Sequence, residues 1–493
     1  MLTLNQSLQL TDKSKNQTAP VTILQIGEGN FLRGFADWMI HVCREKGLYE
    51  GGIAITQPRP AGRAKIEKLA SQDGLYTLVT QGIENGAPVS RKEVIDVFSE
   101  VFDPYSDWER FKGLAVSPEL QVVISNTTEA GLVYRPEELG EGAILSFPGK
   151  VAYLLHLRFE AFQGATDKGL VFLPCELLER NGDSLRDAVL RYADDWGFSE
   201  AFKGWVTGHN RFLNSLVDRI VTGYPAEEQA EAWFAEWGYR DGLLCTAEPY
   251  HLWAIEADEE LEKLLPLRKA GLNVYWTDDL KPFQQRKVRI LNGAHTWMAT
   301  LGLVNGVQHV GDILEHRQLG AQARSAVEKH IVPTLPYPEE ELRAYASDVF
   351  ERFANPHIRH RLADIAMNAL SKFKVRLLPT IAYYAERGEA IPESLALGFA
   401  GLLRYYQTTR EEDGSFTGRT LDGVAYTVRD DESKAALLAS IWEKALADKA
   451  DSAAVASALL AEKELWGEDL TSWSNLTEAV AKQLSELEGG VYR

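Results

Sequence analysis

The chain has 493 residues, a hydrophobic content of 45% and a formal net charge of −19 at pH 7. A chain of this length exceeds one ordinary hydrophobic core, so two or three domains are expected. The acidic balance argues against a nucleic-acid partner, because such proteins need basic surfaces to displace counterions. An anionic small-molecule ligand would have to be met by locally placed Lys or Arg side chains.

The cysteines and the opening segment indicate in which cellular compartment the protein is expected. Cys43, Cys175 and Cys245 are widely spaced and odd in number, which predicts neither a disulfide framework nor a metal site. Residues 1–20 lack an apolar core, so we expect no signal peptide. No apolar run approaches the roughly 20 residues that a membrane helix needs. These features predict a reduced, cytoplasmic protein with no membrane partner.

The first predicted elements form a strand–helix–strand unit. Residues 21–26, VTILQI, are a short apolar run typical of a strand buried on both faces. Residues 30–47 then space their apolar side chains at helical intervals, and residues 51–58 predict the next strand. Gly27 and Gly29 lie at the turn between the first strand and the helix. Together these features predict a βαβ unit.

The glycine turn is an incomplete dinucleotide fingerprint. Gly27 and Gly29 would permit the tight turn and the close approach of a pyrophosphate to the helix N-terminus. A Gly-x-Gly after a strand is also found in plain turns. The third small position is Leu32, which predicts either looser helix–strand packing or a different entry of the helix. The next strand ends without an acid for a ribose hydroxyl. Arg59 there would favour the 2′-phosphate of NADP, or would simply be a solvated side chain beside prolines.

Later segments repeat the alternation and then change in character. Residues 120–131 and 169–185 each read as a buried strand that runs into a polar loop. Strands that alternate with helices predict a parallel sheet with ligands beyond the carboxyl ends of its strands. Beyond about residue 275 the patterns are long, helical and rich in strong helix formers, with few strand candidates. We therefore expect an α/β fold: a Rossmann-type dinucleotide-binding domain over residues 1–274 and a mainly helical substrate or catalytic domain over residues 275–493.

A lysine in the second half interrupts an apolar helix face. On an α-helix of about 100° per residue, Lys287 lies within the stripe of Leu291, Ala294 and Met298. A lysine that faces a core has its pKa lowered by burial and can then act as a general acid or base. Asn292 and His295 flank the stripe, where an amide could hydrogen-bond a developing oxyanion.

The alternative for this helix is structural. Lys287 could extend along the edge of the stripe to solvent, with His295 an ordinary partly buried histidine. Gly293 in the middle of the helix favours function, because it permits the close approach of a ligand. A zinc mechanism is not expected, since His357 and His360 lack the His-Glu-x-x-His pattern and a cysteine partner.

The order of motifs resembles a known family. Gly27-x-Gly29-Asn30-Phe31-x-Arg33 and Lys287-x4-Asn292-x2-His295 together are similar to the polyol-specific long-chain dehydrogenases, the mannitol dehydrogenase family. Five further stretches match this family in order: residues 125–131, 174–182, 212–221, 248–256 and 355–379. The matching stretches span roughly residues 21–380, and their joint order is far more specific than any single motif.

The resemblance implies a metal-independent dehydrogenase with NAD as cofactor, a lysine as catalytic acid or base, and a set of site residues. The implied catalytic residues are Lys287, Asn292 and His295. The implied cofactor-binding residues are Gln25, Ile26, Gly27, Glu28, Gly29, Asn30, Phe31, Leu32, Arg33, Asn126, Thr127 and Glu129. Lys372 aligns with the family's substrate-binding lysine, and the further substrate-binding candidates are Arg376, Arg361 and Asn181.

Two departures from the family pattern bear on the substrate. The family's first Asn in residues 174–182 is Leu177 here, so an oxyanion role does not transfer to it, and Asp364 replaces a family arginine. The turn at residues 25–35 and the segment 371–380 are most similar to members that interconvert D-tagaturonate and D-altronate in hexuronate catabolism. The alternatives are D-fructuronate, a neutral polyol such as mannitol, and a non-enzymatic sensor of dinucleotides or sugar acids.

Overall fold

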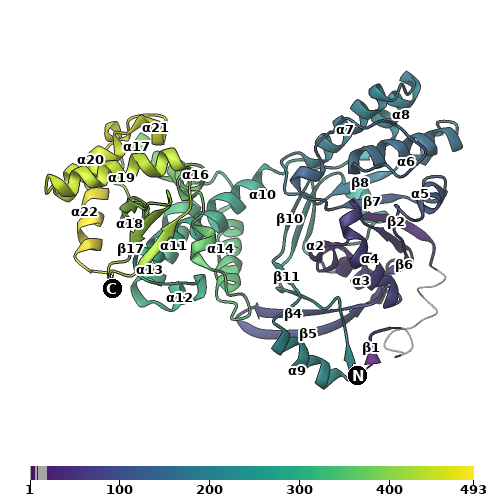
Figure 1. Ribbon diagram of the computed structural model, residues 1–493, viewed down its shortest axis with the longest axis horizontal. Helices are drawn as coiled ribbons and strands as arrows, with labels where there is room; N and C mark the ends of the chain where they lie inside the picture. The colour runs from purple at the N-terminus through teal and green to yellow at the C-terminus, as the bar shows by residue number, and fades with distance from the viewer. Residues whose placement is uncertain (1, 6–7, 9–18, 493) are drawn as a thin grey trace. The chain divides into compact units, whose positions relative to one another are not determined.

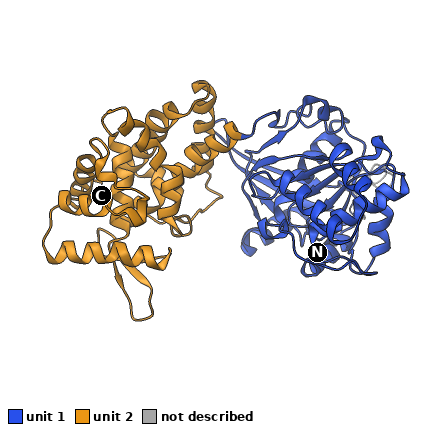
Figure 2. Cartoon of the chain, turned by 90° about the horizontal axis from the view of Figure 1, so that it is seen from above, with its two compact units in different colours: residues 1–280 blue, residues 281–493 orange. Residues whose placement is uncertain are grey.

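The computed structural model describes residues 2–5, 8 and 19–492, and the chain divides into two compact units, residues 1–280 and 281–493 (Figure 2). The opening segment for which no signal peptide is expected lies mostly outside the described residues. The expected division after residue 274 falls at the start of strand β15 (Val274–Thr277). This strand pairs with β14 (Leu252–Glu256), so it belongs to unit 1, and the division lies a few residues later.

Unit 1 contains the predicted parallel sheet (Figure 1). All of its neighbouring strands run parallel, and their spatial order is β6-β3-β2-β7-β8-β9. The strands are β2 (Val21–Ile26), β3 (Gly52–Thr56), β6 (Phe98–Val101), β7 (Val122–Ser125), β8 (Val171–Pro174) and β9 (Arg211–Phe212). Ile26 lies opposite both Thr56 and Ser125, so β2, β3 and β7 end at one level. The strand order reverses at β2, which is where ligands of such sheets bind.

Helices cover both faces of this sheet, and each face has its own hydrophobic core. The side chain of Ile23 lies in one core, and the side chains of Leu24 and Ile26 lie in the other. The first core is covered by α3 (Ala36–Glu45) and α4 (Arg63–Ser71). The second core is covered by α5 (Trp108–Ala115), α6 (Phe147–Ala161), α7 (Asn181–Asp195) and α8 (Glu200–His209). This arrangement confirms the expected α/β class.

The helix expected over residues 30–47 is broken. A single turn, α2 (Asn30–Arg33), is separated from α3 by Gly34 and Phe35. The carbonyl of Arg33 accepts a hydrogen bond from the Tyr76 hydroxyl at 2.6 Å, and the carbonyl of Gly34 accepts one from Nη1 of Arg219 at 2.7 Å. Side chains distant in sequence therefore bind the carbonyls that a continuous helix would use.

Unit 1 also contains antiparallel strands that the sequence analysis did not anticipate. The β4–β5 hairpin turns at Asn85 and Gly86, which both have positive φ. Asn-Gly is the typical sequence of such a turn, so this signal was present but not used. The additional elements are β1 (Leu2–Thr3), β4 (Tyr76–Glu84), β5 (Ala87–Ile95), β10 (Ser215–Asp218), β11 (Val221–Gly223), α9 (Glu227–Trp237), β12 (Tyr239–Arg240) and β13 (Cys245–Ala247).

Unit 2 is mainly helical, as expected. Its central helices are α11 (Asn292–Val304) and α18 (Glu393–Tyr405), which pack against each other, and α18 also packs against α22 (Leu476–Glu488). Around them lie α10 (Lys281–Arg286), η6 (Lys287–Leu291), α12 (Val310–Glu315), α13 (Arg317–Ser325), η7 (Ala326–Ile331), α14 (Glu339–Phe353), α15 (Leu362–Ile365), α16 (Ala369–Arg376), α17 (Leu378–Glu386), α19 (Glu432–Ala447), α20 (Ser452–Leu460) and α21 (Lys463–Trp466).

A small antiparallel sheet adds to the helices of unit 2. It consists of β16 (Thr408–Arg410), β17 (Phe416–Arg419) and β18 (Ala425–Val428). Asp413–Gly414 lies in the turn between the first two strands, a dipeptide that favours hairpins. Across the described part of the chain, no helix combines the length and apolar character required to span a membrane. The three cysteines are buried and not joined in disulfides.

Candidate functional site

The glycine turn after β2 is shaped for a ligand at one of its two glycines. Gly27 has φ of +143°, and a Cβ there would lie 2.9 Å from the carbonyl oxygen of Asn126, so the fold itself requires this glycine. Gly29 has an ordinary φ of −69°, and a Cβ there would meet none of the described atoms within 4 Å. Since the protein does not crowd Gly29, the open space above it suits a pyrophosphate that approaches the backbone.

Several of the expected cofactor residues present only their backbone to this turn. The side chains of Gln25, Ile26, Leu32 and Arg33 are all buried. Leu32 packs tightly over Gly27, with Cδ1 3.2 Å from the position of a Cβ on Gly27, so the looser packing expected here is wrong. The Arg33 guanidinium donates to the carbonyl of Leu243, and its Nη2 donates to Oδ1 of Asn30 at 2.6 Å. Glu28, Asn30 and Phe31 are the partly exposed side chains of the turn.

The buried acid Glu176 holds the loop that follows β7. This loop lies beside the glycine turn, because β2 and β7 are neighbouring strands that end at one level. Oε1 of Glu176 accepts hydrogen bonds from the backbone amide of Thr127 at 2.9 Å and from its hydroxyl at 3.1 Å. Ser125 donates to Oε2 of the same carboxylate. Burial raises the pKa of Glu176, and these hydrogen bonds oppose the rise. Asn126 donates from Nδ2 to the carbonyl of Cys175 at 2.6 Å, whereas Glu129 is exposed.

Glu176 was not among the predicted site residues, although it lies in the stretch 174–182 that matches the family. Its signal was an acid directly after a buried strand, next to a second strand end that carries hydroxyl side chains. The following loop contains Thr128 with φ of +79°, a conformation that is unfavourable for a β-branched residue. Such strain is concentrated at functional loops, and here it lies at the carboxyl end of β7.

In unit 2, Lys287 begins a π-helical turn rather than a regular α-helix. Between α10 and α11 the chain forms the π-helix η6, and the amide of Asn292 donates to the carbonyl of Lys287. An α-helix would set these residues about 140° apart, but a turn with i→i+5 hydrogen bonds brings them closer to one face. The α-helical projection used for Lys287 is therefore wrong. Its side chain is half-buried, not enclosed in the apolar core.

Asn292 and His295 lie at the start of α11, next to the π-helical turn. The His295 side chain is buried, and its ring lies 4.5 Å from Phe353 and 4.9 Å from His360 between centroids. Burial lowers the pKa of His360, and the charge of Asp364 opposes this shift. Gly293 does not open a space for a ligand as expected, because a Cβ there would lie 3.4 Å from Cδ2 of Leu377. A Cβ at this position would make ordinary van der Waals contact with Leu377.

Two cations from α16 lie near the start of α11. Nη1 of Arg376 donates to the Thr296 hydroxyl at 3.0 Å and to the carbonyl of Asn292 at 3.5 Å. Burial lowers the pKa of Arg376, and no carboxylate in the described chain offsets this effect. Nζ of Lys372 donates to the carbonyl of Ile365 at 2.8 Å. Burial and then the charge of Arg376 lower the pKa of Lys372, while Asp430 raises it.

The two remaining substrate candidates are placed differently. Arg361 is exposed, and its charge lowers the pKa of Asp364. Asn181 is buried in unit 1, where Nδ2 donates to the carbonyls of Pro174, Glu176 and Ser215, and Oδ1 accepts from the amides of Gly182 and Ser215. The side-chain amide of Asn181 has no hydrogen-bonding capacity left for a substrate, so Asn181 is not part of the proposed substrate site.

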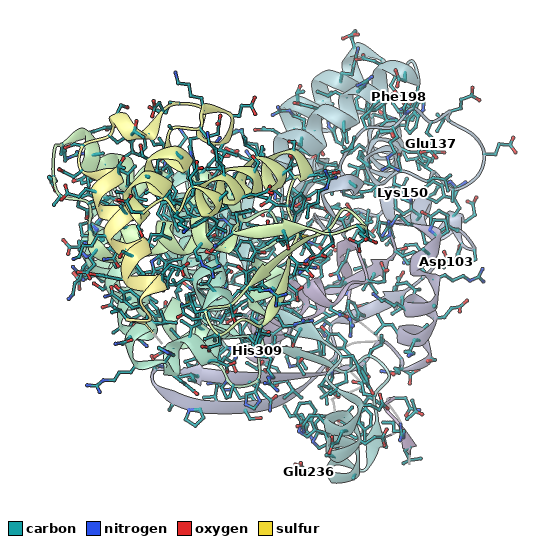
Figure 3. All side chains as sticks on the ribbon, turned by 60° about the vertical axis from the view of Figure 1, so that its left-hand side comes forward. Asp103, Glu137, Lys150, Phe198, Glu236 and His309 are labelled. Atoms are coloured by element: carbon teal, nitrogen blue, oxygen red, sulfur yellow. The ribbon has the colours of Figure 1, made fainter. Side chains whose placement is uncertain are left out.

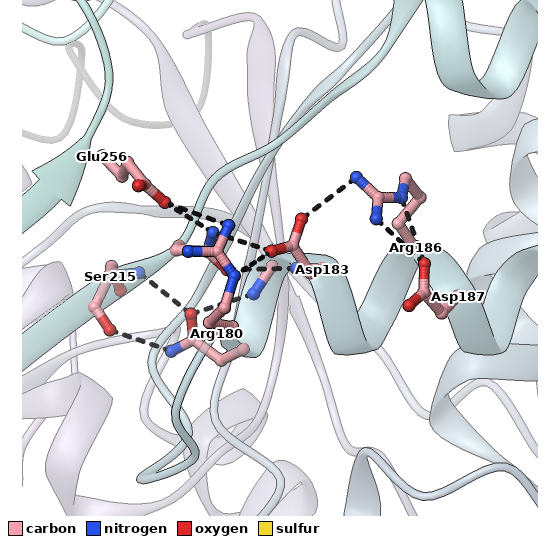
Figure 4. Close-up of polar contacts among 9 residues, drawn as sticks. Arg180, Asp183, Arg186, Asp187, Ser215 and Glu256 are labelled. Atoms are coloured by element: carbon pink, nitrogen blue, oxygen red, sulfur yellow. Dashed lines mark hydrogen bonds and ion pairs between the residues drawn. The ribbon is translucent and has the colours of Figure 1, made fainter. Parts of the chain in front are cut away.

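A surface network closes over this buried amide (Figure 4). Arg180 has a left-handed backbone with φ of 52°, and its Nε donates to Asp183 at 2.5 Å. Asp183 also pairs with Arg186 at 3.0 Å, and Nη2 of Arg180 lies 3.7 Å from Glu256 on β14. These contacts connect the start of α7 to the neighbouring sheet. Leu177, which stands where the family has its first Asn, is exposed in the same loop.

The described residues contain no group of three or more His, Cys, Asp or Glu side chains that could hold a metal ion. His357 and His360, considered in the sequence for zinc, lie in a loop, and the ring of His360 contacts His295. The polar groups that unit 2 brings near the start of α11 are Lys287, the amide of Asn292 and the half-buried guanidinium of Arg376.

The parallel sheet with its glycine turn defines a Rossmann-type dinucleotide-binding unit, and comparisons with known proteins identify the family. Residues 21–269 match the mannitol dehydrogenase Rossmann domain, and residues 279–488 match the mannitol dehydrogenase C-terminal domain. The chain belongs to the mannitol dehydrogenase family and is an oxidoreductase that acts on CH–OH groups.

Among its relatives are two altronate oxidoreductases, from Halalkalibacterium halodurans and Bacillus subtilis. Each relative is 42% identical to this chain, and each alignment covers 95% of this chain. The alignments cover 91% and 93% of the two relatives, respectively. Solved structures with the same fold include Pseudomonas fluorescens mannitol 2-dehydrogenase (TM-score 0.65, covering 100% of this chain and 98% of that one) and a D-sorbitol dehydrogenase (TM-score 0.79, covering 100% and 99%). Both are 22% identical to this chain.

Proposed function

We propose that this protein catalyses the NAD-dependent, reversible reduction of D-tagaturonate to D-altronate. The altronate oxidoreductases that align over nearly the whole chain support the substrate class. The observation that carries the proposal is Arg376, a half-buried guanidinium beside Asn292 whose charge meets no carboxylate of the described chain. A partly desolvated cation without a counter-ion suits the carboxylate of a sugar acid and gives a neutral polyol no advantage.

The residues around the glycine turn suit a dinucleotide. The backbone of Gly27 to Asn30 would hold the pyrophosphate over the open space at Gly29. Asn126 and Thr127 would face the same edge of the sheet, since β2 and β7 end at one level. Bound NADH supplies a hydride to the keto carbon of the substrate. The helix contribution is smaller than a long helix would give, because α2 has a single turn.

Lys287 and Asn292 would act on the substrate oxygen. In the reducing direction the Lys287 ammonium donates a proton from Nζ to the carbonyl oxygen, and in the oxidising direction its neutral amine accepts the hydroxyl proton. The side-chain amide of Asn292 donates a hydrogen bond to that oxygen as negative charge develops. The π-helical hydrogen bond between these two residues supports their joint action. His295, enclosed by Phe353 and His360, would orient the substrate rather than exchange its proton.

Arg376 and Lys372 would bind the carboxylate of the sugar acid. Burial, and after it the charge of Arg376, lower the pKa of Lys372, and an anion between the two cations would relieve their repulsion. The net charge of −19 repels an anionic substrate at long range, so these local cations have to provide the attraction. Arg361 is a peripheral candidate, because it is exposed and close to the acidic side chain of Asp364.

The test is an NADH-oxidation assay with D-tagaturonate, D-fructuronate and D-fructose at equal concentrations, repeated with NADPH. We expect the highest kcat/KM with D-tagaturonate and NADH. Arg376→Leu should raise KM for the sugar acid while leaving that for D-fructose unchanged, since only the acid carries the carboxylate. A preference of the wild type for D-fructose would reject the carboxylate site. Binding of the dinucleotide with no NADH oxidation in the presence of any of these substrates would instead support the sensor alternative.

A further inference from the structure

Rossmann-type units usually have an acid at the carboxyl end of the strand equivalent to β3, where it hydrogen-bonds the adenosine ribose. This chain has no acid directly after β3, but other carboxylates lie near the end of that strand. Gln57, directly after β3, is fully buried. Its Nε2 donates to Oδ1 of Asp103 at 2.6 Å. Asp103 comes from the loop after β6, the strand that lies beside β3 in the sheet. A carboxylate from the neighbouring strand thus lies against the residue that would normally carry one.

The two oxygens of the buried Asp103 side chain have different partners. Oδ1 accepts the hydrogen bond from Gln57 and another from the amide of Tyr105 at 2.9 Å. Oδ2 lies 3.7 Å from Nε of Arg63, whose side chain is 61% exposed. Arg63 donates from the same Nε to Glu67 at 2.7 Å, so its guanidinium does not enclose Oδ2. One oxygen of Asp103 therefore holds Gln57, and the other pairs with Arg63 at a separation beyond hydrogen-bond distance.

Glu28 of the glycine turn brings a second carboxylate to the same place. A Cβ on Gly62 would lie 2.6 Å from Oε1 of Glu28 and 2.5 Å from Cβ of Gln57. Gly62 therefore permits the Glu28 carboxylate to lie directly over the start of α4, next to Gln57. Because Arg63 follows Gly62 in the chain, the carboxylates of Glu28 and Asp103 flank one short segment.

Two further observations point to a ligand at this edge. Oε1 of Gln57 is buried and has no hydrogen-bond partner among the residues that the structure describes, so the cluster contains an unused acceptor. The surrounding loops are held in place by Lys150, whose Nζ donates to the carbonyl of Pro58 at 3.1 Å and to the Tyr105 hydroxyl at 2.8 Å (Figure 3). Acceptors held rigidly at the end of β3 suit the two hydroxyls of a ribose.

We propose that the carboxylates of Glu28 and Asp103 together accept hydrogen bonds from the adenosine ribose hydroxyls and thereby select NAD over NADP. The inference rests on the proposed dinucleotide function and replaces the acid that is missing after β3. The 2′-phosphate of NADP carries nearly two negative charges and would meet both carboxylates. Arg59 is exposed at this edge. Arg63 is the other exposed cation described at this edge, and it is shared between Asp103 and Glu67.

Isothermal titration of the full chain with NAD⁺ and NADP⁺, without sugar acid, tests this assignment. The wild type should bind NAD⁺ at least about tenfold more tightly than NADP⁺. Asp103→Asn and Glu28→Gln should each weaken NAD⁺ binding by about tenfold to a hundredfold, the range for hydrogen bonds to a charged group. NADP⁺ binding should stay constant or strengthen, because a repelling charge is removed. Glu109→Gln, an exposed carboxylate on α5, is the matched control and should keep the wild-type ratio.

The ratio of the two dissociation constants separates recognition from damage to the fold. A variant that unfolds loses both dinucleotides in proportion, whereas the assignment requires the ratio to fall. Equal affinity of the wild type for both dinucleotides, or an unchanged ratio in both variants, would overturn it. Failure to reduce D-tagaturonate would reject the proposed substrate, yet a ratio that falls in these variants would still support the roles of Glu28 and Asp103.

Discussion

At the scale of residues, the proposed chemistry rests on Lys287 and Asn292, whose backbones are joined by a π-helical hydrogen bond. A general acid and an oxyanion donor must reach the same substrate oxygen, and a π-turn brings residues five apart towards a common face. π-Helical turns within α-helices are frequently found at functional sites. The side chain of Lys287 is half-buried.

Replacement of Lys287 by Ala tests the lysine directly. General acid–base groups contribute about 10²–10⁴-fold, so Lys287→Ala should lower kcat by this factor. Dinucleotide affinity should be unchanged, because the glycine turn lies in unit 1. The measurement is steady-state NADH oxidation, with Lys281→Ala on the neighbouring α10 as the control for loss of a lysine. Near-normal turnover of Lys287→Ala would reject its assignment as acid or base.

Asp37 is a buried acid directly beneath the glycine turn. Its side chain is fully buried and accepts a hydrogen bond from Nε2 of Gln25 at 3.2 Å. Gln25 also donates to the carbonyl of Gly27 at 3.0 Å, so this pair supports the turn from below. Burial raises the pKa of Asp37 to about 8, although Gln25 and Arg33 lower it. At neutral pH the folded chain therefore favours the protonated acid.

This raised pKa predicts how stability depends on pH. Between about pH 4 and pH 8 the unfolded chain has released the Asp37 proton while the folded chain retains it, so this group makes folding weaker as pH rises. Asn does not titrate, and the stability of Asp37→Asn relative to wild type should increase across that window by up to about 1.4 kcal/mol per pH unit. Urea unfolding at several pH values measures the difference. A difference that is constant with pH would contradict the raised pKa.

At the scale of elements, the helices of unit 2 pack closely where glycines face large side chains. A Cβ on Gly398 of α18 would lie 2.2 Å from Cδ1 of Trp297 on α11. Trp297 is buried and donates from Nε1 to the carbonyl of Ser394 at 2.6 Å, so its ring has no room to move. The two central helices of the unit depend on this small residue, and α11 carries the proposed active-site amide Asn292.

Gly398→Ala should destabilise unit 2 because the added methyl group overpacks this contact. The expected loss is about 1–3 kcal/mol in the free energy of unfolding, the usual range for overpacked cores. Gly311→Ala on α12 is the matched control, since its Cβ would lie 3.7 Å from the Phe353 carbonyl oxygen, an ordinary contact distance. In a helix that change should stabilise by about 0.5–1 kcal/mol. Thermal and urea unfolding compare the two, and equal stabilities would contradict the packing assignment.

At the scale of the whole molecule, unit 1 contains hydrophobic cores of its own. Both hydrophobic clusters that cover the parallel sheet consist of residues between Ile23 and Trp276. The dinucleotide turn and the ribose-side carboxylates all belong to unit 1, and Lys287, Asn292 and Arg376 all belong to unit 2. Units with complete cores of their own generally fold independently.

Separate expression of residues 1–280 tests this division. The fragment should unfold cooperatively and bind NAD⁺ with an affinity within about tenfold of the full chain, because its core and its glycine turn are complete. It should show no NADH oxidation with any sugar acid, since the proposed acid and the substrate cations are absent. Circular dichroism and calorimetric titration provide the measurements. A folded fragment that fails to bind NAD⁺ would show that unit 2 contributes to the cofactor site.

The sequence alone was sufficient wherever neighbouring residues determine the structure. The strand Val21–Ile26, its glycine turn and the alternation of strands with helices follow from local hydrophobic pattern and backbone freedom. The ordered motifs were also sufficient for the family, since they are spread over most of the chain. The helical character of unit 2 followed from residue propensity, although the hairpin signals at Asn85–Gly86 and Asp413–Gly414 were present and not used.

The tertiary structure alone decided the features that depend on partners distant in sequence. Tyr76 and Arg219 break the predicted helix after Arg33 because they bind its backbone carbonyls. Asn181 is a structural residue because Ser215 uses both sides of its amide. The acid missing after β3 is matched by Asp103 from another loop. Each of these outcomes comes from hydrogen bonds that close long loops of chain. A local pattern carries no information about them, because a buried polar group binds whichever partner the fold brings to it.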